Sequence, residues 1–334
     1  MTGITDNIQK LINGLFIPAM PLALDDDRKF DERVQRRILR HYVSCGAGGI
    51  AAAVHTTQFE IRDPRIGLHE RVLSVTADEL SAHGGIVKIA GVCGKTEQAV
   101  REAELSAEYG YDAVLLSPGG LKALSEAELI YRSEKVAEVL PVVGFYLQEA
   151  VGGRYLSFDF WKKFCEIENV YAIKCAAFNR YATIDTMRAA ALSRRAGKIG
   201  MYTGNDDNIG ADLLTTYRFT YDGAVYEKRF TGGLLGHWAV WTKTAVRLYE
   251  KFRTAADKGE IAPDLLTAAA AVTDMNSAVF DTAHNYKGCI AGVHEVLRRE
   301  GVMENILCLD PDETLSEGQA EEIDRVYAAY PDLI

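Results

Sequence analysis

The sequence lacks the marks of membrane-spanning, secreted and nucleic-acid-binding proteins. It has no run of about 20 apolar residues, the length that a helix needs to cross a bilayer. It has no excess of basic residues either: the formal net charge is −10, which disfavours nucleic acids and anionic membranes as partners. Its first residues show neither the basic flank nor the apolar core of a signal peptide, so we expect a cytoplasmic protein.

Three common site motifs are also missing. The six cysteines show no Cys-x-x-Cys or other metal-ligand spacing, so we expect free thiols in a reducing compartment. No Gly-x-Gly-x-x-Gly follows the first predicted strand, which removes the main reason to expect a dinucleotide-binding fold. No set of histidines and carboxylates gathers at the predicted strand ends, which disfavours a metal-dependent enzyme.

What the chain does contain is a regular alternation of short apolar runs and amphipathic segments. This alternation predicts an α/β protein, a (β/α)8 TIM barrel over residues 1–257. Residues 258–334 are helical by pattern and predict a C-terminal helical extension. The predicted strands are 15–22, 48–54, 86–92, 112–116, 141–147, 170–174 and 198–203, with an eighth near Thr231 after an irregular segment over 221–230. The predicted barrel helices are 31–44, 67–82, 96–109, 125–139, 158–167, 183–196 and 208–219.

The run Asn169-Val-Tyr-Ala-Ile-Lys-Cys-Ala-Ala places Lys174 inside an otherwise apolar strand. Burial disfavours the charged ammonium and lowers its pKa, and the neutral amine is the form that attacks carbonyl carbons. Lys174 is therefore a candidate Schiff-base nucleophile at the carboxyl end of a strand, where barrel enzymes carry their catalytic groups. The alternative is a lysine that reaches the surface or pairs with a carboxylate. A rival, Lys88, lies in the middle of another apolar strand.

Tyr146 ends the strand that precedes the Lys174 strand, so the two residues should lie on neighbouring strands. Side chains alternate along a strand, which groups Tyr146 with Gly144 and Val142 on one face, and Lys174 with Ala172. If both faces point inward, the phenol and the amine share the mouth of the barrel, where a tyrosine can move protons. The alternative is a core tyrosine that bonds to a backbone carbonyl.

Two loops at the same end of the barrel carry candidate substrate-binding groups. Thr56 and Thr57 supply hydroxyls and backbone amides suited to a small carboxylate. Arg62 and Arg65 can reach a distal anion, or can be solvated arginines paired with neighbouring acids. The second loop, Gly204-Asn-Asp-Asp, can equally be a turn that leads into a helix cap.

In order along the chain, these segments resemble the dihydrodipicolinate synthase and N-acetylneuraminate lyase superfamily of Schiff-base aldolases. The resemblance covers most of the chain, and its specificity lies in the order of the motifs rather than in any one of them. The segments that carry it are Met20-Pro-Leu, His55-Thr-Thr-Gln-Phe, Leu68-His-Glu-Arg, Ala90-Gly-Val, Phe145-Tyr146, Ile173-Lys174, Thr203-Gly-Asn-Asp-Asp, Asn285-Tyr-Lys-Gly and Leu297-Arg-Arg-Glu-Gly-Val.

The resemblance implies a carbon–carbon or carbon–oxygen lyase in which Lys174 condenses with pyruvate or a related 2-oxo acid. By match to the family motif, Tyr146 moves the protons. The imine acts as an electron sink, which requires no metal and no dissociable cofactor. A homotetramer is also implied. The residues expected to bind the substrate are Thr56, Thr57, Gly204, Asn205 and Arg154.

Two departures from the family pattern affect the expected substrate. Ser117-Pro-Gly-Gly replaces the segment that carries the second tyrosine of the synthase proton relay, and Val151 stands where an arginine would bind a second carboxylate. We therefore expect an aldolase or dehydratase acting on a keto-sugar acid or another 2-oxo acid, and not a true dihydrodipicolinate synthase. Two alternatives remain open: a non-catalytic barrel that binds a 2-oxo acid, and a metal-dependent class II barrel enzyme.

Overall fold

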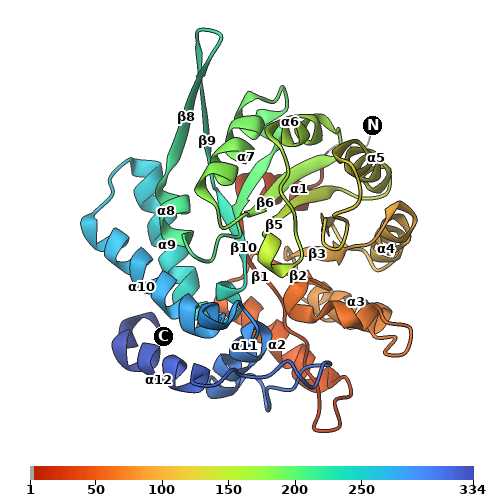
Figure 1. The fold of residues 1–334 in the computed structure, drawn as a ribbon, viewed down its shortest axis with the longest axis vertical. Helices are drawn as coiled ribbons and strands as arrows, with labels where there is room; N and C mark the ends of the chain where they lie inside the picture. Colours follow the sequence, from red (N-terminus) through yellow and green to blue (C-terminus); the bar gives the residue numbers. More distant parts are fainter. Residues whose placement is uncertain (1–3) are drawn as a thin grey trace.

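Eight parallel strands form a barrel surrounded by helices (Figure 1). The computed structural model describes residues 4–334. The strands are hydrogen-bonded in the order β1-β10-β7-β6-β5-β4-β3-β2, and a parallel bridge between Ala19 and Ala51 joins the two ends of this series. The predicted (β/α)8 fold is confirmed. The barrel strands are β1 (Phe16–Pro18), β2 (Gly49–Ala52), β3 (Val87–Val92), β4 (Ala113–Leu116), β5 (Val142–Leu147), β6 (Val170–Ala176), β7 (Gly200–Thr203) and β10 (Gly232–Leu235).

The barrel helices are α2 (Glu32–Cys45), α3 (His69–Ser81), α4 (Thr96–Glu108), α5 (Glu126–Ala137), α6 (Phe158–Glu166), α7 (Arg180–Leu192), α8 (Ile209–Leu214) and α9 (Thr242–Lys258). Four of them, α2, α5, α6 and α7, begin at a residue whose side chain caps the helix. The Asp31 carboxylate accepts a hydrogen bond from the backbone N–H of Val34, and Ser125 forms a capping box with Glu128. These caps satisfy N–H groups that have no partner within the helix, so they help to fix where these four helices start.

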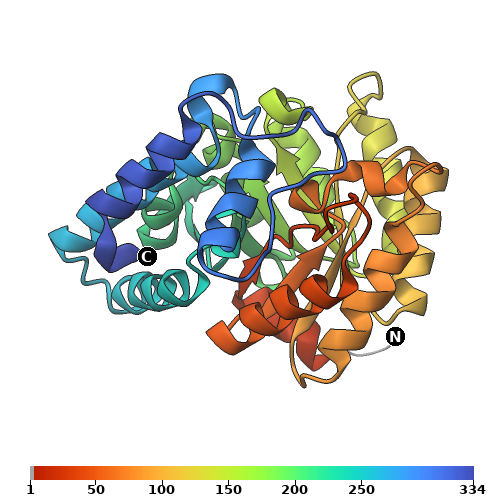
Figure 2. The same ribbon diagram turned by 90° about the horizontal axis from the view of Figure 1, so that it is seen from below.

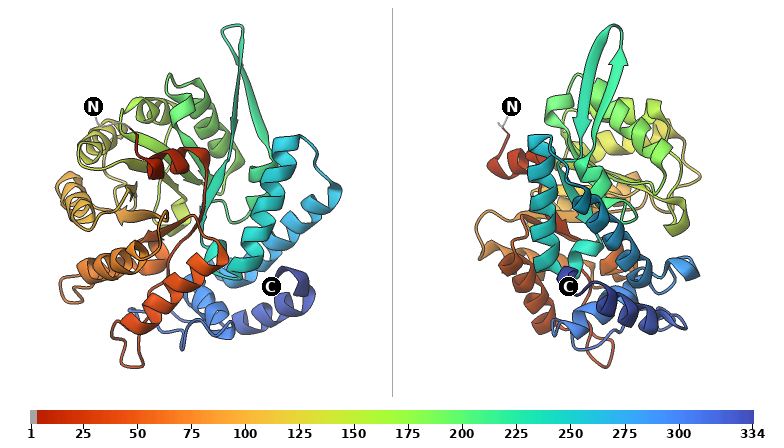
Figure 3. Two further views of the ribbon diagram at one scale, coloured as in Figure 1. Left: turned by 180° about the vertical axis from the view of Figure 1, so that it is seen from behind. Right: turned by 90° about the vertical axis from the view of Figure 1, so that its left-hand side faces the viewer.

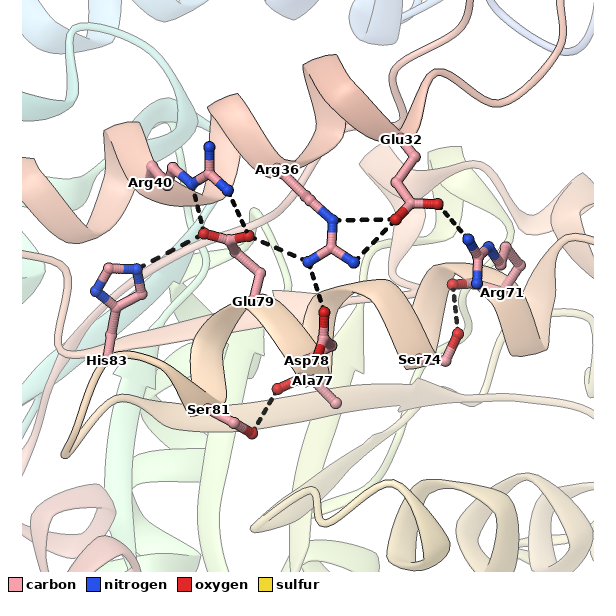
Figure 4. A network of polar contacts seen from close by, with 10 residues as sticks. All are labelled: Glu32, Arg36, Arg40, Arg71, Ser74, Ala77, Asp78, Glu79, Ser81 and His83. Carbon is pink, nitrogen blue, oxygen red and sulfur yellow. Dashed lines mark hydrogen bonds and ion pairs between the residues drawn. The ribbon is translucent and has the colours of Figure 1, made fainter.

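A network of ion pairs fixes α2 against α3 on the outside of the barrel (Figure 4). Its centre is Glu79, which is only 6% exposed and accepts hydrogen bonds from Arg40 Nε (2.6 Å) and Arg36 Nη1 (3.2 Å). Arg36 also pairs with Asp78 and Glu32. Hydrogen bonds from Arg40 lower the pKa of Glu79 despite its burial. Because several charges share one buried carboxylate, this network contributes more than an isolated surface pair.

Between α8 and β10 the chain forms a hairpin that projects from the barrel, at the top of Figure 1 and in both panels of Figure 3. Its strands, β8 (Thr216–Tyr221) and β9 (Ala224–Arg229), are antiparallel. The turn residues Asp222 and Gly223 both have positive φ angles (49° and 76°), as a two-residue hairpin turn of this kind requires.

This hairpin corrects two predictions. The segment 221–230 is regular and not irregular, because the Asp-Gly pair makes a tight turn between two strands. The helix predicted over 208–219 is too long: α8 ends at Leu214, and β8 begins two residues later. The eighth barrel strand follows the hairpin, at the position expected near Thr231.

A short helix that the sequence pattern did not predict, α1 (Asp6–Asn13), lies across the amino-terminal end of the barrel (Figure 3, left). Its residues Ile8 and Leu11 pack with the inward-facing apolar side chains of the strands. The Tyr202 hydroxyl, inside the barrel, donates a hydrogen bond to the Leu11 carbonyl at 2.6 Å. The barrel is therefore filled and closed at this end.

The C-terminal extension lies on one side of the barrel (Figures 1 and 2) and shares its core. It contains α10 (Pro263–Val279), α11 (Cys289–Arg299) and α12 (Gln319–Ala329). Val272, Met275 and Val293 belong to the same apolar cluster as the barrel helices. Because the core is continuous, the extension is in place to contribute to a site in the barrel. Among the helices of residues 4–334, none has both the length and the apolar character that a bilayer crossing requires.

Candidate active site

A cavity lies at the carboxyl ends of the barrel strands, with about 90 Å³ of free space. One water molecule needs about 10–15 Å³, so the cavity has room for a small organic molecule. Active sites of this fold lie at the same end of the barrel. The lining residues are Ala19, Val54, His55, Thr56, Phe145, Leu147, Gln148, Val151, Lys174, Ala176, Phe178, Gly204, Asp206, Gly236, Phe280, Tyr286 and Cys289.

Lys174 extends from β6 into this cavity. Its Nζ lies 4.4 Å from the centre of the Phe145 ring, and no hydrogen bond or ion pair to it occurs within residues 4–334. Burial lowers the pKa of Lys174 to about 8, and the negative charge of Asp206 opposes this shift. The expected position of Lys174, inside the barrel and near the end of its strand, agrees with the structure. Its role as the nucleophile stays a prediction.

Asp206 is the acidic group that faces the same cavity, from the loop after β7. One carboxylate oxygen, Oδ1, accepts a hydrogen bond from the His237 backbone N–H at 3.0 Å. Burial raises the pKa of Asp206 to about 7, while the hydrogen bond from His237 and the charge of Lys174 oppose the shift. Sequence reasoning treated this loop as a possible turn and missed Asp206. The available signal was an aspartate in the loop that follows a barrel strand, three residues after the last residue of β7.

Tyr146 does not share the cavity with Lys174, so the predicted pairing is wrong. In the register of β5 and β6, Phe145 lies beside Lys174, and Tyr146 lies beside Cys175 on the outer face. The Tyr146 ring stacks on Trp161 of α6 with centroids 5.5 Å apart, and its hydroxyl accepts a hydrogen bond from Leu156 N. Apolar residues occupy both faces of a buried parallel strand, so the composition of β5 did not reveal which face points inward.

The two predicted threonines have different environments. Both hydroxyls donate to the Met20 carbonyl, at 3.1 Å from Thr56 and 2.7 Å from Thr57. Thr56 lines the cavity, whereas Thr57 is fully buried beneath it and accepts a hydrogen bond from Val54 N. Next to them, burial and the nearby Lys174 charge lower the pKa of His55 to about 4, so the imidazole is neutral near pH 7.

The side-chain amide of Asn205 forms its hydrogen bonds within the protein, and Asn205 does not line the cavity. Its amide nitrogen donates to Asp212 at 2.9 Å, and its carbonyl oxygen accepts from the backbone N–H of Phe178 at 3.0 Å. Phe178, at the mouth of the cavity, has a positive φ of 50°, a conformation that is unfavourable for a bulky residue. The Asn205 side chain therefore positions the rim and does not contact a ligand directly.

Gly204 lines the cavity because no side chain fits there. A Cβ atom at this position would lie 2.7 Å from Lys174 Cε and 2.8 Å from the Ala176 Cβ. We expect Gly204→Ala to displace the Lys174 side chain and to slow imine formation by about 10- to 100-fold, the scale of a misplacement of about 1 Å. The matched control is Gly197→Ala, which adds a Cβ with no atom within 4 Å. Equal rates for the two variants, measured by borohydride trapping, would contradict this reading.

The arginines considered from the sequence are all bound elsewhere, and none lines the cavity. Arg154 does not lie where a substrate-binding residue was expected, so this prediction is wrong. Its guanidinium donates hydrogen bonds to the Lys122 and Leu124 backbone carbonyls and holds a neighbouring loop. Arg62 is buried and pairs with Glu102 at 3.1 Å. Arg65 is exposed and pairs with Asp63. The reading of Arg65 as a solvated partner of a neighbouring acid is confirmed.

The model of the dihydrodipicolinate synthetase family matches residues 13–329. The chain belongs to this family. No curated protein sequence matches the chain. Within residues 4–334, no group of three or more histidine, cysteine or acidic side chains is arranged to hold a metal ion.

Several solved structures of this family share the fold at low sequence identity. The dihydrodipicolinate synthase of Oceanobacillus iheyensis is 15% identical with a TM-score of 0.78, over 98% of this chain and 100% of that chain. The Acinetobacter baumannii synthase, crystallised with pyruvate, is 18% identical with a TM-score of 0.76, over 94% and 98%. The N-acetylneuraminate lyase of Mycoplasma synoviae is 18% identical with a TM-score of 0.71, over 95% and 98%.

In this member of the dihydrodipicolinate synthetase family, the C-terminal extension forms a roof over the cavity, through Phe280, Tyr286 and Cys289. Tyr286 and the residue before it both have positive φ angles (67° and 54°). The Tyr286 ring meets the Phe178 ring edge to face, with centroids 6.1 Å apart. Non-glycine residues adopt such conformations at a cost, and they cluster at functional sites. Sequence reasoning missed this roof, because helical patterns do not reveal which way an extension folds.

Proposed function

We propose that the protein is a lyase, of the aldolase or dehydratase type, that forms an imine between Lys174 and pyruvate or a related 2-oxo acid. The observation that carries the proposal is a lysine amine that lines a partly enclosed cavity and forms no ion pair with any residue of the described range 4–334. Such an amine is partly neutral near pH 7 and can attack a carbonyl carbon. The family adds support, since the similar synthase of Acinetobacter baumannii is crystallised with pyruvate.

In the proposed reaction, the neutral amine of Lys174 adds to the keto carbon, and the carbonyl oxygen leaves as water. The protonated imine then withdraws electrons from the neighbouring bond, so a carbon–carbon bond or a carbon–oxygen bond can break. We assign the accompanying proton transfers to Asp206, because it faces the cavity beside Lys174 and because its raised pKa suits a group that both accepts and donates protons. Tyr146 has no part in this scheme.

The carboxylate of the 2-oxo acid requires hydrogen-bond donors at the same end of the barrel. We propose that it binds at the short helical turn η1 (His55–Thr57), which follows β2. The first N–H groups of a helical turn lack partners within it, so the backbone amides of η1 are the proposed donors. The Thr56 hydroxyl lines the cavity and donates to the Met20 carbonyl, so it donates to the substrate only when it exchanges that partner. Thr57 supports the turn from below, through its bonds to Met20 and Val54.

The test is reduction with borohydride in the presence of pyruvate, followed by peptide mass analysis. We expect one reduced adduct, on the peptide that contains Lys174, and no adduct when the 2-oxo acid is omitted. Absence of an adduct, or an adduct on Lys88 instead of Lys174, would contradict the proposal. An adduct without turnover of any 4-hydroxy-2-oxo acid would favour a barrel that binds 2-oxo acids without catalysis.

The pH dependence of trapping follows from the pKa of Lys174. Burial lowers this pKa to about 8 from 10.5, so the neutral amine accumulates as the pH rises toward 8. We expect the initial rate of adduct formation to rise up to about pH 8 and then to level off. An ordinary lysine would give a rate that still rises near pH 10. The measurement is the adduct fraction at short times, with cyanoborohydride as the reductant.

A further inference from the structure

The outer part of the cavity is apolar, and this property points to a class of substrate. We propose that the group carried by the 2-oxo acid beyond its reacting carbons is uncharged and apolar, either aromatic or branched aliphatic. This inference rests on the proposed function, since it assumes that Lys174 holds the keto carbon. It narrows the expectation from the sequence, a keto-sugar acid or another 2-oxo acid, to the second of these two classes.

The residues that line the cavity lie at different depths along the barrel axis. Lys174 lies on β6 itself, whereas Val151, Phe178 and Phe280 follow the strand ends or belong to the roof, so they lie toward the mouth. Leu147, the last residue of β5, lies between these two levels. A substrate bound through its keto carbon at Lys174 therefore places its distal group among aliphatic and aromatic side chains. Burial of apolar surface there is favourable.

The charged side chains that line the cavity disfavour an anionic distal group. Among residues 4–334, Lys174 is the one lysine or arginine that lines the cavity, and the proposed reaction uses its amine. Asp206 adds a carboxylate to the same space. A second carboxylate on the substrate would thus enter a buried region with no cation to pair with and with one acid to repel it. Burying an unpaired charge is costly, so anionic distal groups are disfavoured.

The cavity offers few hydrogen-bond partners to a distal group that carries several hydroxyls. A sugar-like chain brings several hydroxyls, and each one loses water when it enters the cavity. Of the polar side chains that line the cavity, those of Thr56, Lys174 and Asp206 are assigned to the proposed reaction, which leaves His55, Gln148 and Tyr286 as partners for a distal group. Each buried polar group left without a partner destabilises the complex, so a chain with several hydroxyls is not well accommodated. An aromatic group, by contrast, can pack against the Phe178 and Tyr286 rings.

Cleavage of such a substrate requires no reactant other than water. A 4-hydroxy-2-oxo acid forms an imine with Lys174 and releases water. The bond between C3 and C4 then breaks: its electron pair passes into the enamine, and the proton of the C4 hydroxyl passes to the Asp206 carboxylate. An aldehyde that carries the apolar group leaves. Asp206 returns the proton to C3, and water hydrolyses the imine to give pyruvate and the free amine.

The test compares 2-oxo acids by borohydride trapping on the full-length protein, which requires no turnover. The probes are pyruvate, 4-methyl-2-oxopentanoate, 4-phenyl-2-oxobutanoate, 2-oxoglutarate and 2-oxo-3-deoxygluconate. We expect the two apolar acids to half-saturate trapping at concentrations at least about 10-fold below those of 2-oxoglutarate and the sugar acid, a difference of about 1.4 kcal/mol. If pyruvate itself leaves no adduct, the proposed function fails. If pyruvate is trapped but 2-oxoglutarate or the sugar acid half-saturates lowest, this inference fails and the proposed function stands.

Two variants at Val151 test whether the apolar wall of the cavity determines this preference. Val151→Arg introduces a cation at the rim, and we expect the preference for 4-methyl-2-oxopentanoate over 2-oxoglutarate to fall by about 10-fold or more. Val151→Leu keeps the wall apolar and should keep the preference. A preference that changes equally in both variants would show that Val151 does not face the distal group. Circular dichroism and melting temperature establish that each variant is folded.

Discussion

Replacing Lys174 with methionine is expected to abolish trapping by borohydride and to reduce turnover by about 10⁴-fold or more, the scale seen when a covalent nucleophile is removed. Methionine keeps the length and the apolar stem of the side chain, so the strand and the cavity should remain intact. The readouts are the mass of the Lys174 peptide after reduction with pyruvate and the rate of 2-oxo-acid chemistry.

The stability of the same variant gives an independent check. The pKa of Lys174 is lower in the folded protein than its usual 10.5, so below about pH 8 the folded state carries the cost of a buried ammonium. Wild-type stability should therefore rise with pH between about 8 and 10.5, where only the unfolded chain still binds the proton. At pH 7, Lys174→Met removes this cost, and its melting temperature should equal or exceed that of the wild type. A large loss of stability would show that the amine has a structural role.

Lys88→Met is the matched control for Lys174→Met. Lys88 also extends from a barrel strand, but its Nζ lies 3.4 Å from the Ser81 hydroxyl of α3, outside the barrel. We expect this variant to retain both trapping and turnover. If Lys174→Met still forms an adduct and Lys88→Met does not, the nucleophile has been assigned to the wrong strand.

Asp206→Asn is expected to separate imine formation from proton transfer. The asparagine oxygen can still accept the hydrogen bond from His237, but the side chain can no longer take up a proton. We expect the exchange of the pyruvate methyl protons with deuterated water, followed by NMR, to fall by about 10²- to 10⁴-fold. Trapping by borohydride should persist, because Lys174 remains in place.

The pH profile of trapping provides a readout that a merely structural role of Asp206 would not change. The negative charge of Asp206 raises the pKa of Lys174, in opposition to burial. Without this charge the pKa falls further, so trapping by Asp206→Asn should level off at a lower pH than trapping by the wild type. An unchanged profile would mean that the two groups do not interact.

Tyr146→Phe is the control that distinguishes Asp206 from the tyrosine expected by family resemblance. The variant loses only the acceptor for the Leu156 N–H, on the outer face of the barrel. We expect proton exchange to stay within about twofold of the wild type, with a modest loss of stability from the unpaired N–H. Loss of exchange in Tyr146→Phe, together with normal exchange in Asp206→Asn, would reverse the assignment.

Much of the fold could be predicted from the sequence, because a barrel repeats one simple pattern. Each buried strand is a short apolar run, and each helix carries an amphipathic face, so the alternation alone gives the architecture. The hairpin was missed because Asp222-Gly223 was not recognised as a tight turn between two strands. The helix α1 was missed because it is short, and because its contacts with the barrel end are visible only in three dimensions.

The site was harder to predict, and the reason lies in the strand faces. A lysine in an apolar strand stands out, so Lys174 could be found. On β5 both faces are apolar, and a shift of one residue exchanges Phe145 with Tyr146 as the neighbour of Lys174. Asp206 and the roof residue Tyr286 come from loops, whose direction no periodicity encodes.

The closure of the barrel by α1 has a kinetic consequence for a lyase with two products. Because α1 fills the amino-terminal end, the cavity at Lys174 lies toward the carboxyl end of the barrel, where Phe178 and the roof line it. In the proposed reaction, the fragment held as an imine lies deepest in this cavity, so we expect it to depart last. Inhibition patterns should reflect this order: the keto-acid product competes with the substrate for the free amine, whereas the product that departs first inhibits noncompetitively.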